Sequence, residues 1–305
     1  MASKDLSSLT SSELRSFLNS FDTVLCDCNG VLWNVETPVP GVKETFQKLK
    51  QCGKQIGFVT NNNVFGAIGV YKNVTKIDSE FEIDSIIVPS QPIIAYLKSL
   101  QFNKEAFVLG SEIMKREFVE AGIKVSEKKI NTTGQIRDLV NELLVDNENI
   151  GAVVVDYDIH INYISLVQAC VLLKQKDMLF ISGATDSKVY YAKNLILPGP
   201  QSFLNALIDV VDQKPISFGK PSLQLSKFIE AKYNIQDSSR VLFIGDSIRQ
   251  DIEFGSISGY QTLLVLTGIT TIADIKDTKN ASQIPNYFIN SLGNLSELIE
   301  NKLGL

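Results

Sequence analysis

Three aspartates lie at or near the ends of apolar runs in the sequence, at positions where folding could bring their carboxylates together. Asp27 follows the apolar run FDTVLC, and Asp246 follows RVLFIG, with Asp251 five residues farther on. Ionised carboxylates in apolar surroundings are costly unless water, a metal or another cation meets them. Three that share one edge of a sheet also repel one another, so a hard divalent cation with oxygen ligands, most naturally Mg2+, is the simplest compensation. For Asp246 alone, helix capping explains the residue equally well.

A cation and a set of hydrogen-bond donors accompany these carboxylates. The segment GKPS places Lys220 just ahead of a predicted helix, where its ammonium could pair with the carboxylates and with a bound phosphoryl oxygen. Thr60 and the amide groups around Asn61 follow another apolar run and could donate hydrogen bonds to a phosphate. Each feature is weak alone, but together they indicate chemistry on a phosphoryl group.

The residues fall at the ends of strands in a repeating pattern of strands and helices. The predicted helices cover 11–19, 42–51 and 222–233, with two more from about 64 and 249, and the predicted strands cover 21–26, 54–60, 85–90, 240–247 and 261–268. This alternation predicts an α/β fold with a parallel sheet, which binds ligands outside the carboxyl ends of its strands. Asp27, Thr60 and Asp246 all lie at such ends.

A long mixed segment separates the two halves of this pattern. It contains the strand-like runs AFVLG, GAVVVDYD and MLFISG and a predicted helix over 164–174, which is too much structure for a loop. We therefore predict a core domain of residues 1–103 and 198–305, interrupted by an inserted α/β domain of residues 104–197. The Pro/Gly stretch ILPGPQSF, 196–203, is the expected return hinge.

In chain order, DCNGVLW, FVTNNN, GKPS and GDSIRQD resemble the four motifs of the haloacid dehalogenase superfamily. Together with GAVVVDYD, NYISL and ILPGPQSF, they further resemble the phosphoglycolate phosphatase and 4-nitrophenylphosphatase family over nearly the whole chain. The resemblance implies a Rossmann-like core and a large α/β cap, inserted after the second motif, that sets substrate specificity. Asp158 and Tyr163 on the cap could line the substrate entrance, although a solvated loop explains Asp158 equally well.

The same resemblance implies catalytic roles. Asp27 would be the nucleophile that forms an aspartyl phosphate, and Lys220 would assist it. Thr60, Asn61 and Asn62 would hold the phosphoryl group. The implied activity is hydrolysis of a small phosphorylated metabolite or an aryl phosphate, and similar proteins often form homodimers through the cap.

A metal site is implied as well. Asp27 and Asp246 would bind Mg2+ together with the backbone carbonyl of Asn29. Asp251 would orient either the metal's water or the ammonium of Lys220. Because a backbone carbonyl is used at position 29, metal binding does not require a particular side chain there.

The side chain of Asn29 nevertheless departs from the family at the most consequential position. These phosphatases carry Asp there as the general acid and base, and an amide cannot exchange that proton. The basic residue that usually follows TNN is also missing, and Ala184 in SGATD replaces an expected Asn. An engineered Asp-to-Asn change would explain only the first departure, so the set indicates a natural, divergent paralogue. We predict a slow phosphatase or, alternatively, a catalytically impaired paralogue that binds a phosphorylated ligand or a protein partner.

Composition excludes several other classes of protein. The 29 basic and 34 acidic residues give a net charge of −5 without a basic run, which argues against a nucleic-acid partner. We expect a cytoplasmic protein without a membrane span, because no apolar stretch is long enough. The single histidine, His160, rules out sites that need two imidazoles, the four cysteines form no CxxC pair, and the absence of GxGxxG disfavours a nicotinamide-dependent dehydrogenase.

Overall fold

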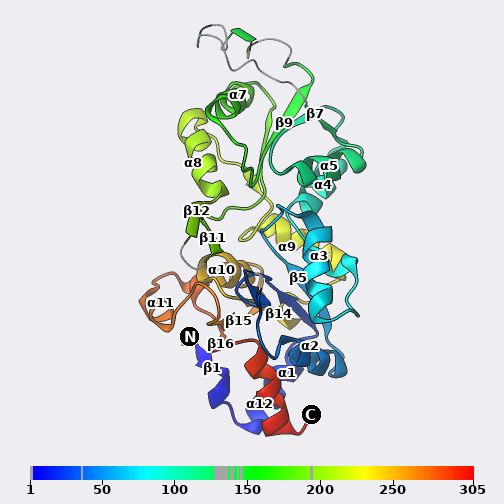
Figure 1. The fold of residues 1–305 in the computed structure, drawn as a ribbon, viewed down its shortest axis with the longest axis vertical. Helices are drawn as coiled ribbons and strands as arrows, with labels where there is room; N and C mark the ends of the chain where they lie inside the picture. Colours follow the sequence, from blue (N-terminus) through cyan, green and yellow to red (C-terminus); the bar gives the residue numbers. More distant parts are fainter. Residues whose placement is uncertain are drawn as a thin grey trace. The chain divides into compact units, whose positions relative to one another are not determined.

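The computed structural model describes residues 3–35, 37–126, 137, 141, 142, 144, 147–192 and 195–305. The chain forms two compact units, drawn in Figure 1. The first comprises Met1–Thr60, Ala67–Ile87 and Lys220–Leu305, and the second comprises Asn61–Gly66 and Val88–Gly219. Among the described residues, no helix combines the length and the apolar composition that crossing a membrane would require.

The first unit is built on a seven-stranded sheet of order β1-β16-β15-β14-β2-β5-β6, in which every neighbouring pair is parallel. This confirms the predicted α/β fold with a parallel sheet. The strands are β1 (Lys4–Asp5), β2 (Thr23–Cys26), β5 (Gln55–Val59), β6 (Ile86–Ile87), β14 (Val241–Gly245), β15 (Gln261–Val265) and β16 (Tyr287–Ile289), with a separate hairpin of β3 (Trp33–Asn34) and β4 (Thr37–Pro38).

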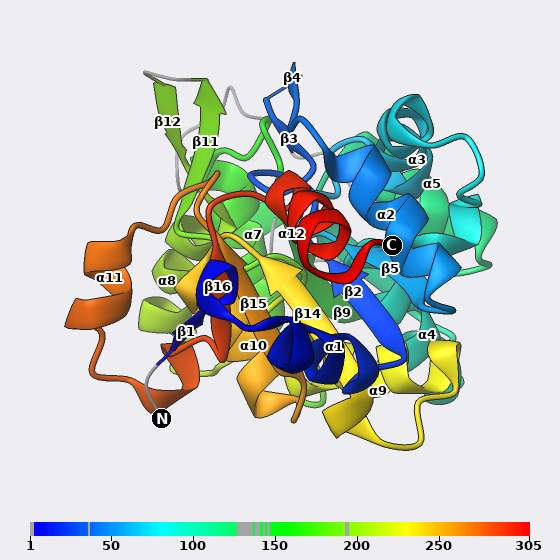
Figure 2. The same ribbon diagram turned by 90° about the horizontal axis from the view of Figure 1, so that it is seen from below.

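Helices surround this sheet, as Figure 2 shows from below. They are α1 (Ser11–Asn19), α2 (Val42–Gln51), α3 (Gly66–Ile77), α9 (Leu223–Tyr233), α10 (Glu253–Ile257), α11 (Ile272–Asp277) and α12 (Gly293–Leu303), with the short turns η1 (Leu6–Ser8), η2 (Ile83–Ser85), η3 (Ser238–Arg240), η4 (Ile248–Ile252) and η5 (Ala281–Gln283).

Burial on both faces explains the uninterrupted apolar strands of this sheet, as expected for a parallel sheet covered by helices. On one face, Leu25 and Phe243 share a core cluster with Ile229 of α9 and Phe254 of α10. The central strand β2 pairs with β14 on one side and β5 on the other, with Cys26 opposite Ile244 and Phe58. The residues that follow these strands therefore emerge at one edge of the sheet.

Local signals account for how closely the predicted helices match. Helices α1 and α2 have the predicted bounds, and Thr10 and Glu13 form a capping box at the start of α1. Helix α9 begins one residue late because Ser222 is its N-cap and accepts a hydrogen bond from the amide of Leu225 at 3.2 Å. The helix expected from about Arg249 begins as the π-helical turn η4 before α10.

The second unit contains a separate parallel sheet of order β13-β10-β9-β7-β8. Its strands are β7 (Glu105–Leu109), β8 (Lys124–Val125), β9 (Ile150–Val155), β10 (Leu179–Ser182) and β13 (Ile216–Ser217), and an antiparallel hairpin joins β11 (Lys188–Ala192) to β12 (Leu195–Pro198). The described helices are α4 (Ser90–Ser99), α5 (Glu112–Glu120), α7 (Tyr163–Leu173) and α8 (Pro200–Val211).

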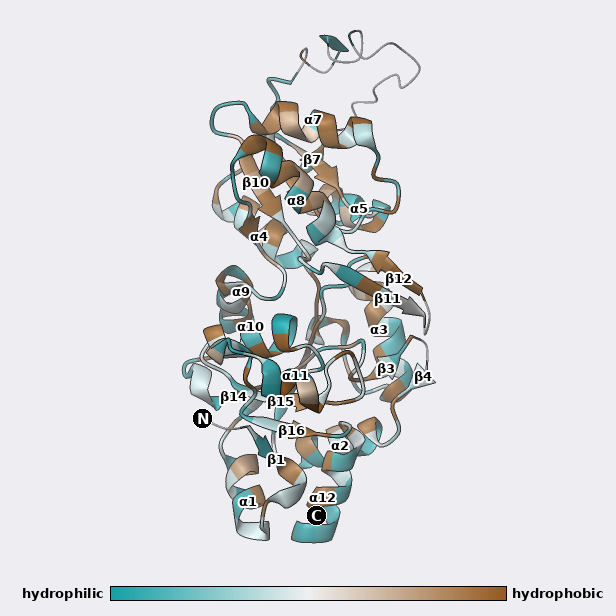
Figure 3. Cartoon of the chain, turned by 90° about the vertical axis from the view of Figure 1, so that its left-hand side faces the viewer, coloured by the Kyte–Doolittle hydropathy of each residue, from teal (hydrophilic) through white to brown (hydrophobic). Residues whose placement is uncertain are grey.

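Alternation along the central strand β9 explains how these helices cover both faces. Val153 and Val155 pack into a cluster with residues of α7 and α8. Ala152 and Val154 point the other way, into a cluster with residues of α4 and α5. Figure 1 shows the two helix pairs on opposite sides of β7 and β9, and α7 is largely brown, and so apolar, in Figure 3. Each unit therefore has a core of its own.

The second unit is longer than the predicted insertion, 104–197. Its longer segment begins at Val88, and Ile93 and Leu97 of α4 pack into the core of this unit. It extends to Gly219 because β13 pairs with β10, with Ile216 opposite Ile181. The stretch 196–203, expected as the return hinge, instead contains the end of β12 and the start of α8.

Candidate active site

The side chain of Lys220 is the centre of a buried charge cluster in the first unit. Its Nζ lies 2.8 Å from Oδ1 of Asp27 and 2.6 Å from Oδ1 of Asp251, and only 2% of the lysine side chain is exposed. Distances this short are typical of charge-assisted hydrogen bonds between ionised groups. The three residues, far apart in sequence, thus form one ionic network at the edge where β2 and β14 end.

The charges in this network decide the protonation of Lys220. Burial alone would lower the pKa of its ammonium, but the carboxylates of Asp251 and Asp27 more than reverse that effect, so the pKa is raised well above its ordinary value. The ring of Phe243 lies 5.5 Å from the ammonium and adds a cation–π contact. Lys220 therefore remains a cation at any physiological pH.

Asp251 is held by hydrogen bonds on both of its oxygens. Oδ1 accepts from Lys220, while Oδ2 accepts from the backbone amides of Asp246 at 3.1 Å and Ser247 at 3.0 Å. The π-helical turn η4 carries the Asp251 carboxylate, which is buried beside the loop that follows β14. Of the two sequence-based roles for Asp251, the geometry supports orientation of Lys220.

Asp246 follows β14 and is packed tightly against neighbouring backbone. Its Oδ2 accepts a hydrogen bond from the amide of Ile269 at 2.9 Å. Gly30 has φ +78°, and a Cβ at that position would lie 2.4 Å from the same oxygen. A larger residue at Gly30 would therefore strain the backbone and displace the carboxylate.

The carboxylates of Asp27, Asp246 and Asp251 each offer an oxygen within 4.8 Å of the others. Burial raises the pKa of Asp27 to about 7, with Lys220 opposing the shift and Asp251 adding to it. Burial and then the charges of Asp251 and Asp27 raise the pKa of Asp246 well above its ordinary range. If all three carboxylates were ionised, one ammonium would leave an excess of negative charge, which either a proton or a second cation must neutralise. This oxygen donor set fits a hard divalent cation.

Asn29 lies beside this cluster with its side chain exposed. Its Oδ1 accepts a hydrogen bond from Nε1 of Trp33 at 3.0 Å, and the amide of Gly30 donates to the carbonyl of Trp33 at 2.8 Å. The amide side chain is thus oriented by an indole that the sequence analysis did not connect to it. An Asp at this position would offer Trp33 the same acceptor.

The residues expected to bind phosphate fall in different units. Thr60 is buried in the first unit, and its amide donates to the carbonyl of Ile87 at 3.1 Å. Asn61 belongs to the second unit, where its Nδ2 donates to Oδ2 of Asp186 at 2.9 Å. In the same loop, Oδ1 of Asn62 accepts from the amide of Val64 at 3.1 Å.

The structure therefore brings together four of the predicted site residues, Asp27, Lys220, Asp246 and Asp251, within one unit. Sequence reasoning gave no role to Asp186, although it lies in the SGATD segment that drew attention through Ala184. On the second unit, Asp158 accepts a hydrogen bond from the amide of His160 at 2.8 Å, a local turn contact. Tyr163 begins α7 and is 69% exposed.

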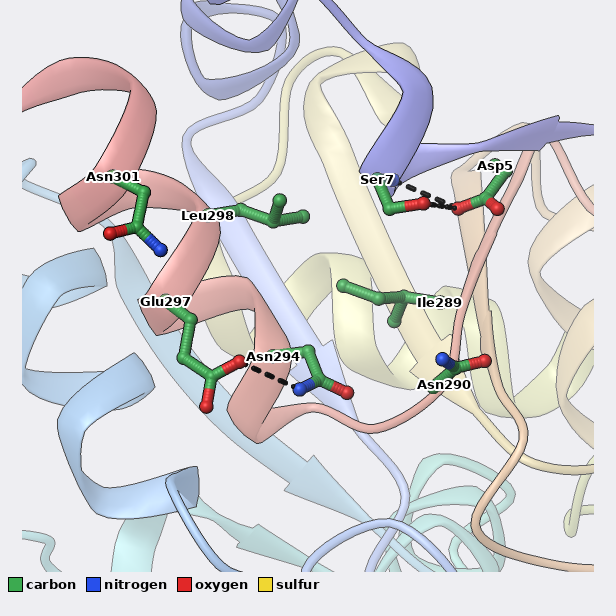
Figure 4. Close-up of a pocket in the computed structure, with 8 residues that line it drawn as sticks. All are labelled: Asp5, Ser7, Ile289, Asn290, Asn294, Glu297, Leu298 and Asn301. Atoms are coloured by element: carbon green, nitrogen blue, oxygen red, sulfur yellow. Dashed lines mark hydrogen bonds between the residues drawn. The ribbon is translucent and has the colours of Figure 1, made fainter.

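A pocket elsewhere on the first unit has no part in this cluster. It encloses about 210 Å³ and is lined by Asp5, Ser7, Ile289, Asn290, Asn294, Glu297, Leu298 and Asn301. Figure 4 shows Ser7 donating to Asp5 and Asn294 donating to Glu297, so each carboxylate already accepts a hydrogen bond from a neighbour. None of the lining residues belongs to the Asp27 cluster.

Comparison with known proteins finds family matches over the segments that contain Asp27, Lys220, Asp246 and Asp251. A family model described as haloacid dehalogenase-like hydrolase matches residues 24–124, and a second, HAD-hydrolase-like, matches 217–295. Phosphoglycolate phosphatase 2 of Arabidopsis thaliana is 31% identical over 96% of this chain and 98% of its own length. The 4-nitrophenylphosphatase of Schizosaccharomyces pombe is 29% identical over 93% and 96%. The crystal structure of a 4-nitrophenylphosphatase from Thermotoga maritima covers 92% of this chain and 98% of its own, with a TM-score of 0.78 and 23% identity, a likeness of fold.

Proposed function

The chain belongs to the haloacid dehalogenase-like hydrolases, and from this premise we propose that it is a Mg2+-dependent phosphomonoester hydrolase that works through an aspartyl phosphate on Asp27. The observation that carries the proposal is the buried pairing of Asp27 with Lys220 beside Asp246 at the end of β2. A nucleophilic carboxylate needs a neighbouring cation when it meets a phosphate dianion, and the pair supplies one.

The reaction proceeds in two displacements. An oxygen of the Asp27 carboxylate forms a bond to phosphorus while the bond from phosphorus to the substrate's alcohol oxygen breaks. The departing oxygen takes a proton from solvent water. A water molecule then attacks phosphorus and gives up a proton to solvent, while the bond from phosphorus to the Asp27 oxygen breaks, which releases inorganic phosphate and restores the carboxylate. Lys220 balances charge on Asp27 and on the phosphoryl oxygens, and Thr60 with the amides of Asn61 and Asn62 donates hydrogen bonds to those oxygens.

The proposed metal ligands are Asp27, Asp246 and the backbone carbonyl of Asn29. Asp251 shares the oxygen cluster, but both of its oxygens already accept hydrogen bonds, so its main role is to hold Lys220 and the loop after β14. A bound Mg2+ would neutralise phosphoryl charge as it develops. The assignment is supported by the excess of negative charge that the three carboxylates would have when ionised, which a divalent cation would neutralise.

The side chain at position 29 determines how fast the enzyme turns over. Asn29 cannot protonate the leaving oxygen or take a proton from water, so we expect slow turnover, with the greatest loss for substrates whose leaving oxygen is strongly basic. The alternative is a catalytically impaired paralogue that binds a phosphorylated ligand or a protein partner. The orientation of Asn29 by Trp33 favours neither reading, because an Asp could occupy the same place.

We assign substrate choice to the second unit, acting as a cap, and expect a small phosphorylated metabolite or aryl phosphate. The relatives named for phosphoglycolate and 4-nitrophenyl phosphate support this size class. We also propose self-association through this unit, since Tyr190, Leu195 and Ile196 on the β11–β12 hairpin are exposed. Sedimentation analysis of the wild type and of Ile196→Lys tests it, and a wild-type monomer would contradict it.

Turnover of 4-nitrophenyl phosphate, measured with and without Mg2+, tests the proposed function. We expect slow turnover that requires Mg2+ and is abolished in Asp27→Asn. Mg2+ should also raise the melting temperature of the wild type but not of Asp246→Ala, since ligand at about 100 times its Kd adds about 2.7 kcal/mol. Activity that survives in Asp27→Asn would indicate a contaminant, and absence of both turnover and a Mg2+ response would contradict the proposal.

A further inference from the structure

We propose that Asp186 is a positioning residue, which fixes the loop Asn61–Gly66 through the side chain of Asn61 so that the loop can bind a phosphoryl group. The inference rests on the proposed function, which assigns phosphate binding to Thr60, Asn61 and Asn62. Asp186 lies in the second unit, 125 residues from Asn61, and the two side chains are joined by a 2.9 Å hydrogen bond.

Side-chain hydrogen bonds join the loop to other segments of the second unit. Nδ2 of Asn61 donates to the carboxylate of Asp186, and Oγ of Ser111, at the start of α5, donates to the carbonyl of Asn63 at 3.0 Å. A hydrogen bond to an ionised acceptor is about twice as strong as one between neutral groups. The contact at Asn61 is therefore the stronger of the two.

Asp186 is itself held in a fixed place. Oδ2 of the buried Asp156, at the end of β9, accepts a hydrogen bond from the amide of Ala184 at 3.2 Å, two residues before Asp186. A Cβ on Gly183 would lie 1.8 Å from the same oxygen, so the strand end approaches this carboxylate as closely as glycine allows. The carbonyl of Asp186 accepts from the amide of Gln201 at 3.1 Å, near the start of α8. The backbone on both sides of the Asp186 side chain is thus held by hydrogen bonds.

Asn61 directly follows Thr60 in the chain, so its hydrogen bond to Asp186 affects the residues that we propose bind phosphate. Thr60 is the last residue of its segment of the first unit, and Asn61 is the first residue of the loop that belongs to the second. The hydrogen bond that Asn61 donates to Asp186 therefore limits the directions in which the backbone amides of Asn61 and Asn62 can point. Donors already ordered before binding cost less conformational entropy when phosphate arrives. Asp186 carries negative charge, so it acts through Asn61 and not by contact with phosphate.

Phosphate affinity in the full-length protein tests this role. Calorimetric titration with inorganic phosphate in saturating Mg2+ should give an affinity about tenfold weaker for Asp186→Ala, the scale of one hydrogen bond to a charged group. Asp186→Asn keeps a neutral acceptor for Asn61 and should bind phosphate more tightly than Asp186→Ala, although less tightly than the wild type. Asp209→Ala, which removes an exposed carboxylate from α8, is the matched control and should change nothing.

A double-mutant comparison separates positioning from general damage to the fold. Adding Asp186→Ala to Asn61→Ala should weaken phosphate binding no further, and Mg2+ affinity should be unchanged in every variant. Circular dichroism establishes whether each variant folds. If Asp186→Ala does not fold, the phosphate affinity of Asp186→Asn is compared with that of the wild type instead. Two results would overturn the role of Asp186 while leaving the proposed function intact. One is that the wild type binds phosphate and Asp186→Ala binds it equally well. The other is that the losses of phosphate affinity in Asn61→Ala and Asp186→Ala add fully in the double variant. Absence of phosphate binding by the wild type would overturn the proposed function and this inference together.

Discussion

Nζ of Lys220 lies 2.8 Å from Oδ1 of Asp27, and both side chains are buried in the first unit. The same ammonium lies 2.6 Å from Oδ1 of Asp251. Oδ2 of Asp251 in turn accepts hydrogen bonds from the backbone amides of Asp246 and Ser247. One lysine therefore connects the proposed nucleophile to the loop that carries a proposed metal ligand. Removing that cation should affect both stability and chemistry.

Lys220→Met should destabilise the protein by about 3–5 kcal/mol, because it leaves two buried carboxylates without their cation. Turnover of 4-nitrophenyl phosphate should fall below detection. Urea denaturation followed by circular dichroism measures the stability. Lys232→Met is the control, since Lys232 pairs with the exposed Asp84 and such pairs contribute about 0–1 kcal/mol. Equal losses in the two variants would contradict the account of the cluster.

Gly30→Ala should reduce Mg2+ affinity, because its Cβ would displace the Asp246 carboxylate that lies 2.4 Å away. Calorimetric titration with Mg2+ measures the change. Gly53→Ala is the matched control: Gly53 has φ +73° and nothing within 4 Å of an added Cβ. Gly53→Ala should lose about 1–2 kcal/mol of stability through left-handed backbone strain, and Gly30→Ala should lose at least as much. If Mg2+ affinity falls equally in both, or in neither, Asp246 is not placed by this contact.

Stability should depend on pH through Asp156 in the second unit. Burial raises the pKa of this carboxyl from 3.8 to about 7, opposed by the amides of Tyr157 and Ala184 and reinforced by Asp186 and Glu117. The folded state therefore binds the proton more tightly than the unfolded state. The protonated group contributes its full stability below about pH 4, and this contribution is lost as the pH rises to about 7. Each unit of pKa shift corresponds to about 1.4 kcal/mol, so the whole contribution is a few kcal/mol.

Asp156→Asn should remove this component. The free energy of unfolding of the wild type, minus that of the variant, should fall between pH 4 and 7 and stay level above pH 7. Urea denaturation at each pH gives the difference, and hydrogen exchange of peptides from β9 and β10 localises it. Asp209→Asn, an exposed change in the same unit, should leave the slope unaltered. A difference that does not vary with pH would show that Asp156 is ionised throughout.

The sequence could predict the Asp27 cluster because the parallel-sheet pattern alone places strand ends at one edge. Asp27 and Asp246 follow buried apolar strands, and the register that sets Cys26 opposite Ile244 brings them together. Two roles remained open for Asp251 in the sequence, because hydrogen bonds to the amides of Asp246 and Ser247 depend on the local π-helical turn.

Other features depend on contacts between distant segments that no local pattern encodes. The second unit extends to 88 and 219 because α4 and β13 pack on its sheet, whereas the Pro/Gly run near 198 suggested an earlier end. Asn61 and Asp186, which share a hydrogen bond, are 125 residues apart in the sequence. The residues around each of them give no local pattern that would predict this contact. Trp33 was recognised as part of a motif, but its bond to Asn29 depends on the turn at Gly30.

Asn29→Asp should raise the turnover of 4-nitrophenyl phosphate by about 10² to 10⁴, the usual contribution of a general acid or base. The new carboxylate can accept the same hydrogen bond from Trp33, so the fold should be unaffected. An alkyl phosphate should gain more than the nitrophenyl ester, because nitrophenolate departs with little need of a proton. Steady-state kinetics on both substrates measures the gain. No gain on either would favour the paralogue that binds without turnover.

The central claim is that Asp27 accepts the phosphoryl group, and intact-mass spectrometry tests it most directly. Wild-type protein, incubated briefly with 4-nitrophenyl phosphate and Mg2+ and then quenched in acid, should gain the mass of one phosphoryl group. The adduct should accumulate because Asn29 cannot activate the water that would hydrolyse it. It should map to the peptide that contains Asp27 and be absent from Asp27→Asn. If no adduct forms in the wild type or in Asn29→Asp, or if Asp27→Asn carries the same adduct, Asp27 is not the nucleophile.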